Sequence, residues 1–495
     1  MEGVYRRQGF CASHETDEAG VSRLFKRLRP GENRANRPLV SFAPSFPLAG
    51  IPVDQSSERQ HCSRIIMSKK CLLIFSANHT SKNIASLRFK LLTKYIDFSE
   101  YEVHIFSHTA AGPPQSTAAD GPDIHIHEAD RYPEGRIARL LNPILVVASA
   151  FASRLPSWVA VMGSKERKGW LVNSISMAEK IAARKKSAGD AVVVVGTYSP
   201  VEALIAAKAL SRKYKLPCLL DFRDGLVFES LGRKGMLYTP LRKAMERTLV
   251  AQADLITSVG KTLVEYFRSA YPGKRVEYLP NGFDRSEFVE AQATIDSSEE
   301  SKLSAIAAPG EIIIGHFGRI SSSDASSIQA LKFLVARINQ AHDLSKNLHF
   351  VFVGDLNDND LMLLKRIKPR TTILPPMDRE AILRFMTKCH FLLLITGDRT
   401  SCATGKIFEY LAAGPEIVCF SAVENEASYI IKASNSGRTI LVGDDQGAER
   451  ILSAISSADR ITDGPRGNTD IFSKPEQAAM FMRWMNQLAH GDAYT

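Results

Sequence analysis

A lysine and a glutamate stand just inside the start of one short, sharply delimited helical pattern. In TGKIFEYLAAGPEIVCF, residues 404–420, Thr404 is a good N-cap and Gly414 followed by a proline marks the stop, which predicts a helix of about ten residues. Lys406 and Glu409 are three positions apart and project from the same face. Free amide groups at a helix start attract an anion, and a lysine beside them adds a point charge suited to a pyrophosphate.

The carboxylate of Glu409 completes this pattern. It lies one helical turn beyond the anion site, where it suits hydrogen bonds from a pair of ribose hydroxyls. Phosphate followed by ribose is the order of a nucleoside diphosphate. Gly405 offers a free amide, while Phe408 belongs with Ile407 and Leu411 to the buried stripe. The alternative is an exposed Lys–Glu pair, which stabilises a solvated helix by about 0.2–0.5 kcal/mol and binds nothing.

Two further strand ends carry residues that suit a ligand. In GHFGRI, Gly318 permits close backbone approach and Arg319 can pair with phosphate oxygens. A tight turn with a surface arginine explains the same residues. In LDFRDGL, Asp221, Arg223 and Asp224 stand at another strand end, where they serve either chemistry or the turn itself.

The acidic loop DLNDND raises the question of a metal. Its Asp358 and Asp360 superficially form a divalent-metal pair. Such residues are more common in a solvated loop, and we therefore interpret them in that way and predict no metal site.

These residues need elements to hold them, and the chain alternates short apolar runs with helical patterns. CLLIFS (71–76), AVVVVG (191–196) and PCLLDF (217–222) are typical of buried strands separated by helices. After residue 285 an acidic, polar stretch intervenes, and the alternation restarts with IIIGHFG (312–318). The pattern predicts an α/β fold with two Rossmann-like, doubly wound halves, and a ligand at the carboxyl ends of the strands between them.

The domain limits follow from the same pattern. Residues 1–66 are rich in Arg, Ser, Pro and Asn without periodicity, and we interpret them as a poorly ordered extension. Met67 opens the first domain-like pattern and is an alternative start codon. We predict an N-terminal domain at 67–285 and a C-terminal domain at 286–495, because 495 residues exceed the roughly 250–300 that one core supports.

Composition narrows the class of partner. The net charge is +10, with 44% hydrophobic and 23% charged residues, a balance typical of a globular protein. The positive charge favours nucleic acid, an acidic membrane surface or a phosphorylated small molecule. No arginine–aromatic interleaving or Cys/His finger spacing occurs, so we predict no nucleic acid partner. Seven widely spaced cysteines are typical of reduced thiols in a cytosolic protein.

The most apolar part of the chain does not have the pattern of a membrane-spanning helix. The stretch 140–163 is interrupted by Asn142, Pro143, Arg154 and Pro156, so it falls short of the roughly 20 apolar residues that a spanning helix needs. The basic, apolar-rich stretch 131–168 suits a position on an anionic membrane surface. An ordinary buried helix with charged flanks is the alternative.

Taken together, the motifs of this sequence resemble those of a known enzyme family. DFRD, ADLITSVGKTLVEYF, VEYLPNGFD, GHFGRI and ATGKIFEYLAAGPEIVCF resemble, in order and spacing, the retaining glycosyltransferases of the GT-B fold, those of glycosyltransferase family 4. The resemblance extends over residues 70–490. It implies two Rossmann-like domains that face each other across a cleft. It also implies that Arg319 and Lys406 hold the pyrophosphate of a UDP- or GDP-sugar, that Glu409 binds its ribose, and that Gly318 gives the backbone room. Gly405 and Phe408 are predicted to contact the donor as well.

Contacts to the sugar and the acceptor are implied less directly. The first-strand loop SANHTSKNIAS lacks the usual glycine pair and leaves three candidates, Asn78, His79 and Ser81. A histidine that often touches the sugar is replaced by Tyr198 and Ser199. A glutamate that often precedes the ribose carboxylate by eight residues is Ser401, and a lysine usual five residues beyond the phosphate arginine is Asp324.

The implied reaction is transfer of a sugar, with retention at its anomeric carbon, to a polysaccharide or lipid-linked acceptor, without metal or cofactor. Lys406 and Arg319 would be catalytic because they stabilise the departing diphosphate. Asp221, Asp224 or Asp398 would assist the acceptor hydroxyl. Such an enzyme would build cell-envelope polysaccharide in the bacterial cytoplasm, in peripheral contact with the inner face of the plasma membrane. A nucleotide-sugar epimerase of the same architecture and a catalytically degenerate sugar-nucleotide-binding protein remain alternatives.

Overall fold

The computed structural model describes most of the chain from residue 69 onward. The described residues are 69–80, 84–108, 124–129, 165–229, 238–293, 306, 310–322, 324–341, 344, 346–401, 403–458, 461–462 and 467–491. All of them belong to one compact unit, Ile66–Thr495. The predicted extension at 1–66, the candidate Ser81 and the greater part of the predicted membrane-surface stretch 131–168 lie outside them.

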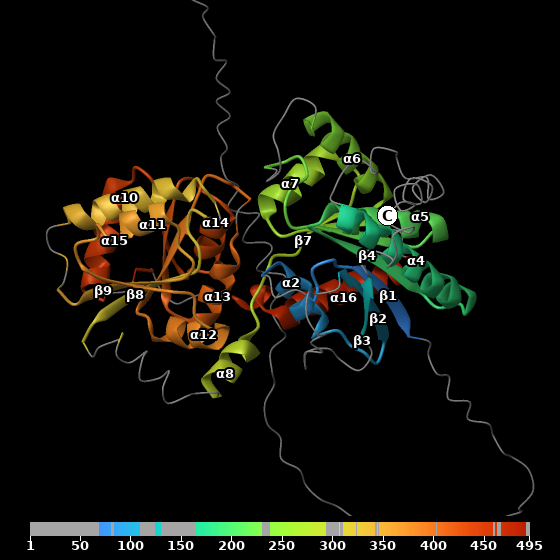
Figure 1. Ribbon diagram of the computed structural model, residues 1–495, viewed down its shortest axis with the longest axis horizontal. Helices are drawn as coiled ribbons and strands as arrows, with labels where there is room; N and C mark the ends of the chain where they lie inside the picture. The colour runs from blue at the N-terminus through green and yellow to red at the C-terminus, as the bar shows by residue number, and fades with distance from the viewer. Residues whose placement is uncertain are drawn as a thin grey trace, which may run out of the picture. The chain divides into compact units, whose positions relative to one another are not determined.

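The first sheet has seven parallel strands in the order β3-β2-β1-β4-β5-β6-β7 (Figure 1). They are β1 (Lys70–Phe75), β2 (Tyr101–His108), β3 (Ile124–Ala129), β4 (Val192–Tyr198), β5 (Cys218–Phe222), β6 (Leu255–Ser258) and β7 (Val276–Tyr278). The winding direction changes between β1 and β4. Both central strands are buried on both faces, which is why they read as continuous apolar runs in the sequence.

Helices cover both faces of this sheet. They are α2 (Ile84–Thr93), α4 (Lys165–Ser187), α5 (Val201–Tyr214), α6 (Tyr238–Gln252) and α7 (Lys261–Ala270). The last helix, α16 (Lys474–His490), packs beside α2 (Figure 1). There Phe481 meets the ring of Phe89 edge to face, with 6.1 Å between the ring centroids, and Ala478 and Met485 lie in the same core.

The second sheet has six parallel strands in the order β10-β9-β8-β11-β12-β13. They are β8 (Ile312–Phe317), β9 (Leu348–Val353), β10 (Arg370–Leu374), β11 (Phe391–Thr396), β12 (Glu416–Ser421) and β13 (Gly437–Leu441). One core contains residues of α8 (Arg285–Ala293), α12 (Arg379–Lys388), α13 (Gly405–Ala413) and α14 (Glu426–Ala433). The other contains residues of α10 (Ser327–Gln340), α11 (Asp358–Leu364) and α15 (Asp445–Ser456).

These two sheets confirm the predicted α/β fold of two Rossmann-like, doubly wound halves. The domain limits 67–285 and 286–495 remain predictions. One observation bears on them: α16 falls in the predicted C-terminal range but buries its apolar face, with Ala478, Phe481 and Met485, in a core of the first sheet. The cysteines that the structure describes are all buried and form no disulfide, and these are Cys71, Cys218, Cys389 and Cys419.

The acidic loop before α11 is only partly solvated. Asp358 is exposed, but Asp360 is fully buried. The carboxylate of Asp360 accepts hydrogen bonds from the amide of Ser321 at 3.1 Å and from its hydroxyl at 2.6 Å. The interpretation of this loop as solvated is therefore wrong for Asp360, whose role is to tie α11 to the segment that follows β8.

Three buried histidines make the stability of the chain sensitive to acid. Burial is the main cause that lowers the pKa of His79 and of His104 to about 4 and that of His316 to about 3. In the unfolded chain these groups regain their ordinary pKa near 6.5. Between pH 6.5 and 4 the unfolded state therefore binds protons that the folded state does not, so the free energy of unfolding falls as the pH falls.

We expect a loss of about 1 to 2 kcal/mol per histidine between pH 7 and pH 5, measured by urea unfolding. The raised pKa values of Glu246 and Glu426, caused mainly by burial, oppose part of this loss. Replacement His79→Gln should flatten the pH dependence, since glutamine does not titrate. Equal stability of the wild type at both pH values would contradict the prediction.

Candidate active site

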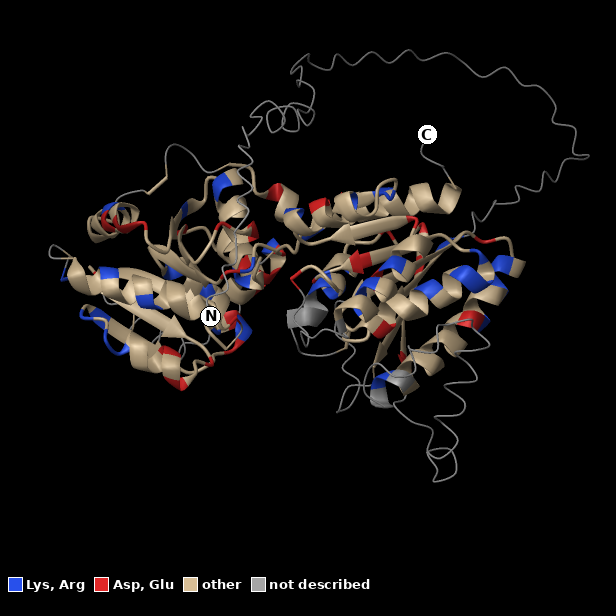
Figure 2. Ribbon diagram, turned by 90° about the horizontal axis from the view of Figure 1, so that it is seen from above, with Lys and Arg blue, Asp and Glu red and all other residues tan. Residues whose placement is uncertain are grey.

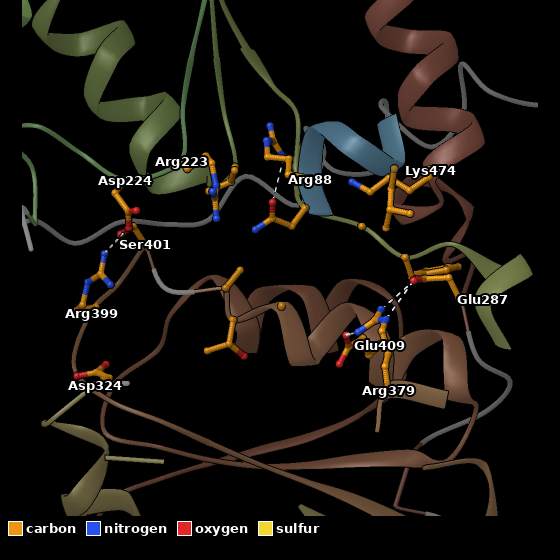
Figure 3. A pocket seen from close by; sticks show the side chains of 18 of the residues that line it. Arg88, Arg223, Asp224, Glu287, Asp324, Arg379, Arg399, Ser401, Glu409 and Lys474 are labelled. Carbon is orange, nitrogen blue, oxygen red and sulfur yellow. Dashed lines mark hydrogen bonds and ion pairs between the residues drawn. The ribbon is translucent and has the colours of Figure 1, made fainter. Parts of the chain in front are cut away.

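Strand ends and helix starts meet around one cavity of about 250 Å³ (Figure 3). It is lined by residues that follow β5, β6, β7, β8 and β11 and by residues of α2, α8, α12, α13 and α16. The charged residues that line it are Arg88, Arg223, Asp224, Glu287, Asp324, Arg379, Arg399, Glu409 and Lys474. Charges of both signs are spread over the helices of both sheets (Figure 2), so net charge alone does not mark this location.

Helix α13 begins at the cavity. Thr404 has the extended backbone of an N-cap, with φ −64° and ψ 149°, and Gly414 ends the helix with φ +108°. The predicted helix is thus confirmed. Gly405 and Glu409 line the cavity, whereas the side chain of Phe408 is buried in the core, with its ring centroid 5.7 Å from that of Phe472. The predicted donor contact of Phe408 is therefore not available to its side chain.

Glu409 shares an arginine with a second carboxylate. Its Oε1 accepts a hydrogen bond from Arg379 Nη1 at 2.8 Å. The same guanidinium donates from Nε and Nη2 to the carboxylate of Glu287, at 3.1 and 2.9 Å. Figure 3 shows these three side chains together at one end of the cavity. Two carboxylates around one guanidinium leave an excess of hydrogen-bond acceptors, which suits sugar hydroxyls.

Lys406 is held at the carboxyl end of β8. Its ammonium donates to the backbone carbonyl of Arg319 and lies 3.5 Å from His316 Nε2. His316 Nδ1 lies 3.0 Å from the carbonyl of Leu393, which can only accept, so Nδ1 carries the hydrogen and Nε2 presents a lone pair to Lys406. Burial, followed by the charge of Lys406, lowers the pKa of His316 to about 3. A neutral His316 therefore orients Lys406.

Gly318 makes room for this lysine. Its φ is +97°, and a Cβ at this position would lie 2.9 Å from Lys406 Cε. The close approach expected at Gly318 is thus to Lys406. Arg319 is 58% exposed and pairs with Asp355 at 3.1 Å. Neither Arg319 nor Lys406 is among the residues that line the cavity.

Asp221 is fully buried and does not line the cavity. Its carboxylate accepts two hydrogen bonds from Arg88, at 2.8 and 3.2 Å, and one at 2.8 Å from each hydroxyl of Thr197 and Thr257. Both oxygens are occupied by protein groups. This arrangement indicates that Asp221 positions Arg88 and does not contact a substrate. Asp224, two residues beyond the strand, does line the cavity and accepts a hydrogen bond from Arg399 Nη2 at 3.2 Å.

The remaining candidates that the structure describes do not line the cavity. Asn78 donates to the carbonyl of Ser199 at 3.2 Å, which ties the first-strand loop to the end of β4. His79 is buried, and Tyr198 is partly buried. Asp398 is exposed, and its amide donates to Ser326 Oγ at 2.9 Å. The structure thus brings Gly405, Glu409 and Asp224 to one cavity but not these loop residues.

A carboxylate from the first half meets the residue that replaces the family glutamate. Glu229 Oε2 accepts hydrogen bonds from the amide and hydroxyl of Ser401 at 2.9 and 2.7 Å. Its Oε1 accepts from the amide and hydroxyl of Thr400 at 2.8 and 2.7 Å. Burial acts to raise the pKa of Glu229, but these hydrogen bonds hold it below its ordinary value. Sequence reasoning missed Glu229 because no motif links it to Ser401.

No role was predicted from the sequence for the arginine and lysine residues that line the cavity either. Arg223 stands in a quoted motif but received no role, and Arg88, Arg379, Arg399 and Lys474 occur in helices and loops without any motif. Their only signal in the sequence is the net positive charge. Lys474 at the first position of α16 could have been noted as an unusual cation at a helix start.

Metal-site geometry occurs elsewhere among the described residues. Glu102, His104 and His125 on β2 and β3 place ligand atoms within 4.8 Å of one another. The carboxylate of Glu102 also pairs with Lys185 at 2.6 Å. None of these residues lines the cavity. Of the helices that the structure describes, none combines the length and the apolar character that a membrane crossing requires.

Comparison with known proteins adds family information to this geometry. Residues 91–282 match the model of the family described as "Glycosyl transferase 4-like domain", while no curated protein matches the chain. Sucrose-phosphate synthase from Thermosynechococcus elongatus superposes with a TM-score of 0.57 at 13% identity, covering 86% of this chain and 100% of that one.

Two further solved structures share the fold. The UDP-forming α,α-trehalose-phosphate synthase from Burkholderia xenovorans, solved with glucose-6-phosphate, has a TM-score of 0.52 at 13% identity and covers 84% of this chain and 100% of its own. A putative UDP-N-acetylglucosamine 2-epimerase from Listeria monocytogenes has a TM-score of 0.50 at 11% identity, with coverages of 86% and 98%. Residues 91–282 thus match a glycosyltransferase domain, and the fold of the chain is that of the GT-B enzymes.

Proposed function

We propose that this protein transfers a sugar, with retention of anomeric configuration, from a nucleotide-sugar donor to a saccharide or lipid-linked acceptor. The observation that carries the proposal is the start of α13 at the cavity, with Gly405 and Glu409 lining it and Lys406 anchored beside it. In this proposal the α13 amides, Lys406 and Arg319 bind the donor diphosphate, and Glu409 binds the ribose. The UDP-forming synthase of the same fold supports a UDP-sugar as the donor.

The chemistry follows from the charge that develops during the reaction. The anomeric carbon becomes oxocarbenium-like as the diphosphate departs, so cations fixed beside that diphosphate stabilise the transition state more than the ground state. Lys406 is proposed for this role because His316 and the Arg319 carbonyl hold it in place before the donor arrives. Asp224 is proposed to assist the acceptor hydroxyl, since it lines the cavity and Asp221 is committed to Arg88.

The cellular setting is proposed from sequence alone. The basic, apolar-rich stretch 131–168 supports peripheral contact with an anionic membrane surface. It fits an enzyme of cell-envelope polysaccharide synthesis that meets a lipid-linked acceptor at the inner face of the plasma membrane, in the bacterial cytoplasm. Vesicle sedimentation with and without anionic lipid would test this part separately.

An epimerase is the second candidate, since a putative UDP-sugar epimerase shares the fold. The experiment that separates the two is incubation of the full chain with UDP-glucose, UDP-N-acetylglucosamine or GDP-mannose in the absence of acceptor. Slow release of the nucleoside diphosphate supports the transferase. Formation of an epimer without nucleotide release supports the epimerase, and tight nucleotide binding with neither reaction supports a degenerate binding protein.

Glu409→Gln is expected to weaken the binding of UDP about tenfold or more, because each charge-assisted hydrogen bond to a ribose hydroxyl contributes roughly 1.5–3 kcal/mol. Isothermal titration calorimetry with UDP measures the change. The matched control is Glu449→Gln on α15, an exposed glutamate outside the cavity. An unaltered affinity in the Glu409 variant would count against ribose contact.

A further inference from the structure

One side of the cavity holds buried positive charge. Lys474, at the first position of α16, is only 1% exposed and yet lines the cavity. Arg88 on α2 and Arg223 after β5 line the same side (Figure 3). All three side chains belong to elements that pack on or follow the strands of the first sheet.

Arg88 is fully committed to the protein. Its guanidinium donates two hydrogen bonds to Asp221, one to each of the carbonyls of Leu279 and Pro280, and one to Asn281 Oδ1. These five bonds use all of its N–H groups. Arg88 therefore holds the loop 279–281 in place, and Asp221 is its ion-pair partner.

Lys474 forms no ion pair of this kind with a described carboxylate. Its ammonium donates to Gln477 Oε1 at 2.9 Å, which is a neutral group and uses one of its three N–H bonds. Among the residues that the structure describes, no carboxylate lies within ion-pair distance of its Nζ. Burial, together with Arg88 and Arg223, holds the pKa of Lys474 well below its ordinary value despite Asp221 and Asp284. The start of α16 adds the positive end of a helix dipole.

Arg223 is a second buried cation beside Lys474, and the carboxylates near it are shared with other arginines. Burial and the charge of Arg88 lower the pKa of Arg223, and Asp224 and Asp221 only partly offset this effect. Asp224 is shared with Arg399, and Asp221 with Arg88. A buried ammonium beside a buried guanidinium is costly unless an anion accompanies them.

Another part of the cavity lining has the reverse character. Arg379 lies there between the carboxylates of Glu287 and Glu409. A ligand that contacts both parts carries an anionic group and hydroxyl groups. A phosphorylated sugar has this composition, and lysine and arginine together are typical phosphate ligands.

We infer that Lys474 and Arg223 bind the phosphate of a phosphorylated acceptor. The inference rests on the proposed function, in which α13, Lys406 and Arg319 of the second half take the donor diphosphate. A transferase binds two substrates, and the second cationic site lies on elements of the first sheet. The phosphate belongs either to a free sugar phosphate or to the diphosphate of a lipid-linked sugar.

The test is titration of the full chain with glucose 6-phosphate, farnesyl diphosphate and inorganic phosphate, each with and without saturating UDP, at constant ionic strength. Unphosphorylated glucose is the ligand control. We expect at least one phosphate-bearing probe to bind the UDP-loaded chain. Preference for glucose 6-phosphate indicates a sugar phosphate, and preference for farnesyl diphosphate indicates a lipid-linked acceptor.

The variants are Lys474→Met, which preserves side-chain length, and Arg223→Met, with Lys365→Met on the exposed end of α11 as the matched control. Each cavity variant should weaken that probe at least tenfold while UDP affinity stays within threefold, and the control should leave both unchanged. The inference is overturned if no phosphate-bearing probe binds, if the cavity variants leave the bound probe unaffected, or if they weaken UDP equally, which assigns the cations to the donor. A chain that binds phosphate probes through Lys474 but never binds UDP would overturn the proposed function instead.

Discussion

Lys406→Ala is expected to lower kcat/KM for sugar transfer by about 10²–10³-fold, because one preorganised donor to a developing anion contributes about that much to the rate. Affinity for UDP should also fall, by about tenfold or more, through the loss of a charge-assisted hydrogen bond. The structure sharpens this expectation. The ammonium is already held by the Arg319 carbonyl and by neutral His316, so the enzyme does not have to order it during the reaction.

The measurement is steady-state release of UDP from the accepted donor, with calorimetry for UDP affinity. Lys365→Ala, on the exposed end of α11, changes the charge equally and should leave both quantities unaltered. Far-UV circular dichroism checks that α13 is retained in the variant. Unchanged kinetics in Lys406→Ala would remove this residue from the donor site and would shift the diphosphate toward the cations of the first half.

Asp221→Asn should be the most destabilising single substitution that we predict. It leaves the guanidinium of Arg88 buried without a counter-charge, and it disturbs the hydrogen bonds from Thr197 and Thr257. Removing one partner of a buried ion pair costs about 3–5 kcal/mol. Urea unfolding followed by tryptophan fluorescence reports on the affected sheet, since Trp170 and Trp484 both lie in its cores.

The control for this prediction is Asp378→Asn at the N-cap of α12, an exposed position whose side chain makes no capping hydrogen bond. It should change the free energy of unfolding by no more than about 0.5 kcal/mol. The double variant Asp221→Leu with Arg88→Met should recover part of the loss, because it removes both buried charges together. A loss below about 1 kcal/mol in Asp221→Asn would show that water reaches this pair and screens it.

The fold was accessible from the sequence because its signals are local. A buried parallel strand needs an unbroken apolar run, and α13 needs its N-cap, its apolar stripe and its terminal glycine within a few positions. The Rossmann-like halves, the strands at 71–76 and 191–196 and the helix at Gly405–Ala413 could all be predicted on these grounds. The apolar stripe of α16 can be predicted from the sequence, but the sheet that it covers cannot. Tertiary packing places this helix on the first sheet.

The composition of the cavity depended on contacts between distant parts of the chain. Asp221 and Asp224 look alike in the sequence, yet one is buried against Arg88 and the other lines the cavity. Glu229 reaches Ser401, and Lys474 reaches the side of Arg88 and Arg223, only because loops and helix starts from both sheets converge there. Local patterns specify backbone conformation, whereas the charges that face one another are set by strand order and by burial, which no short stretch of sequence contains.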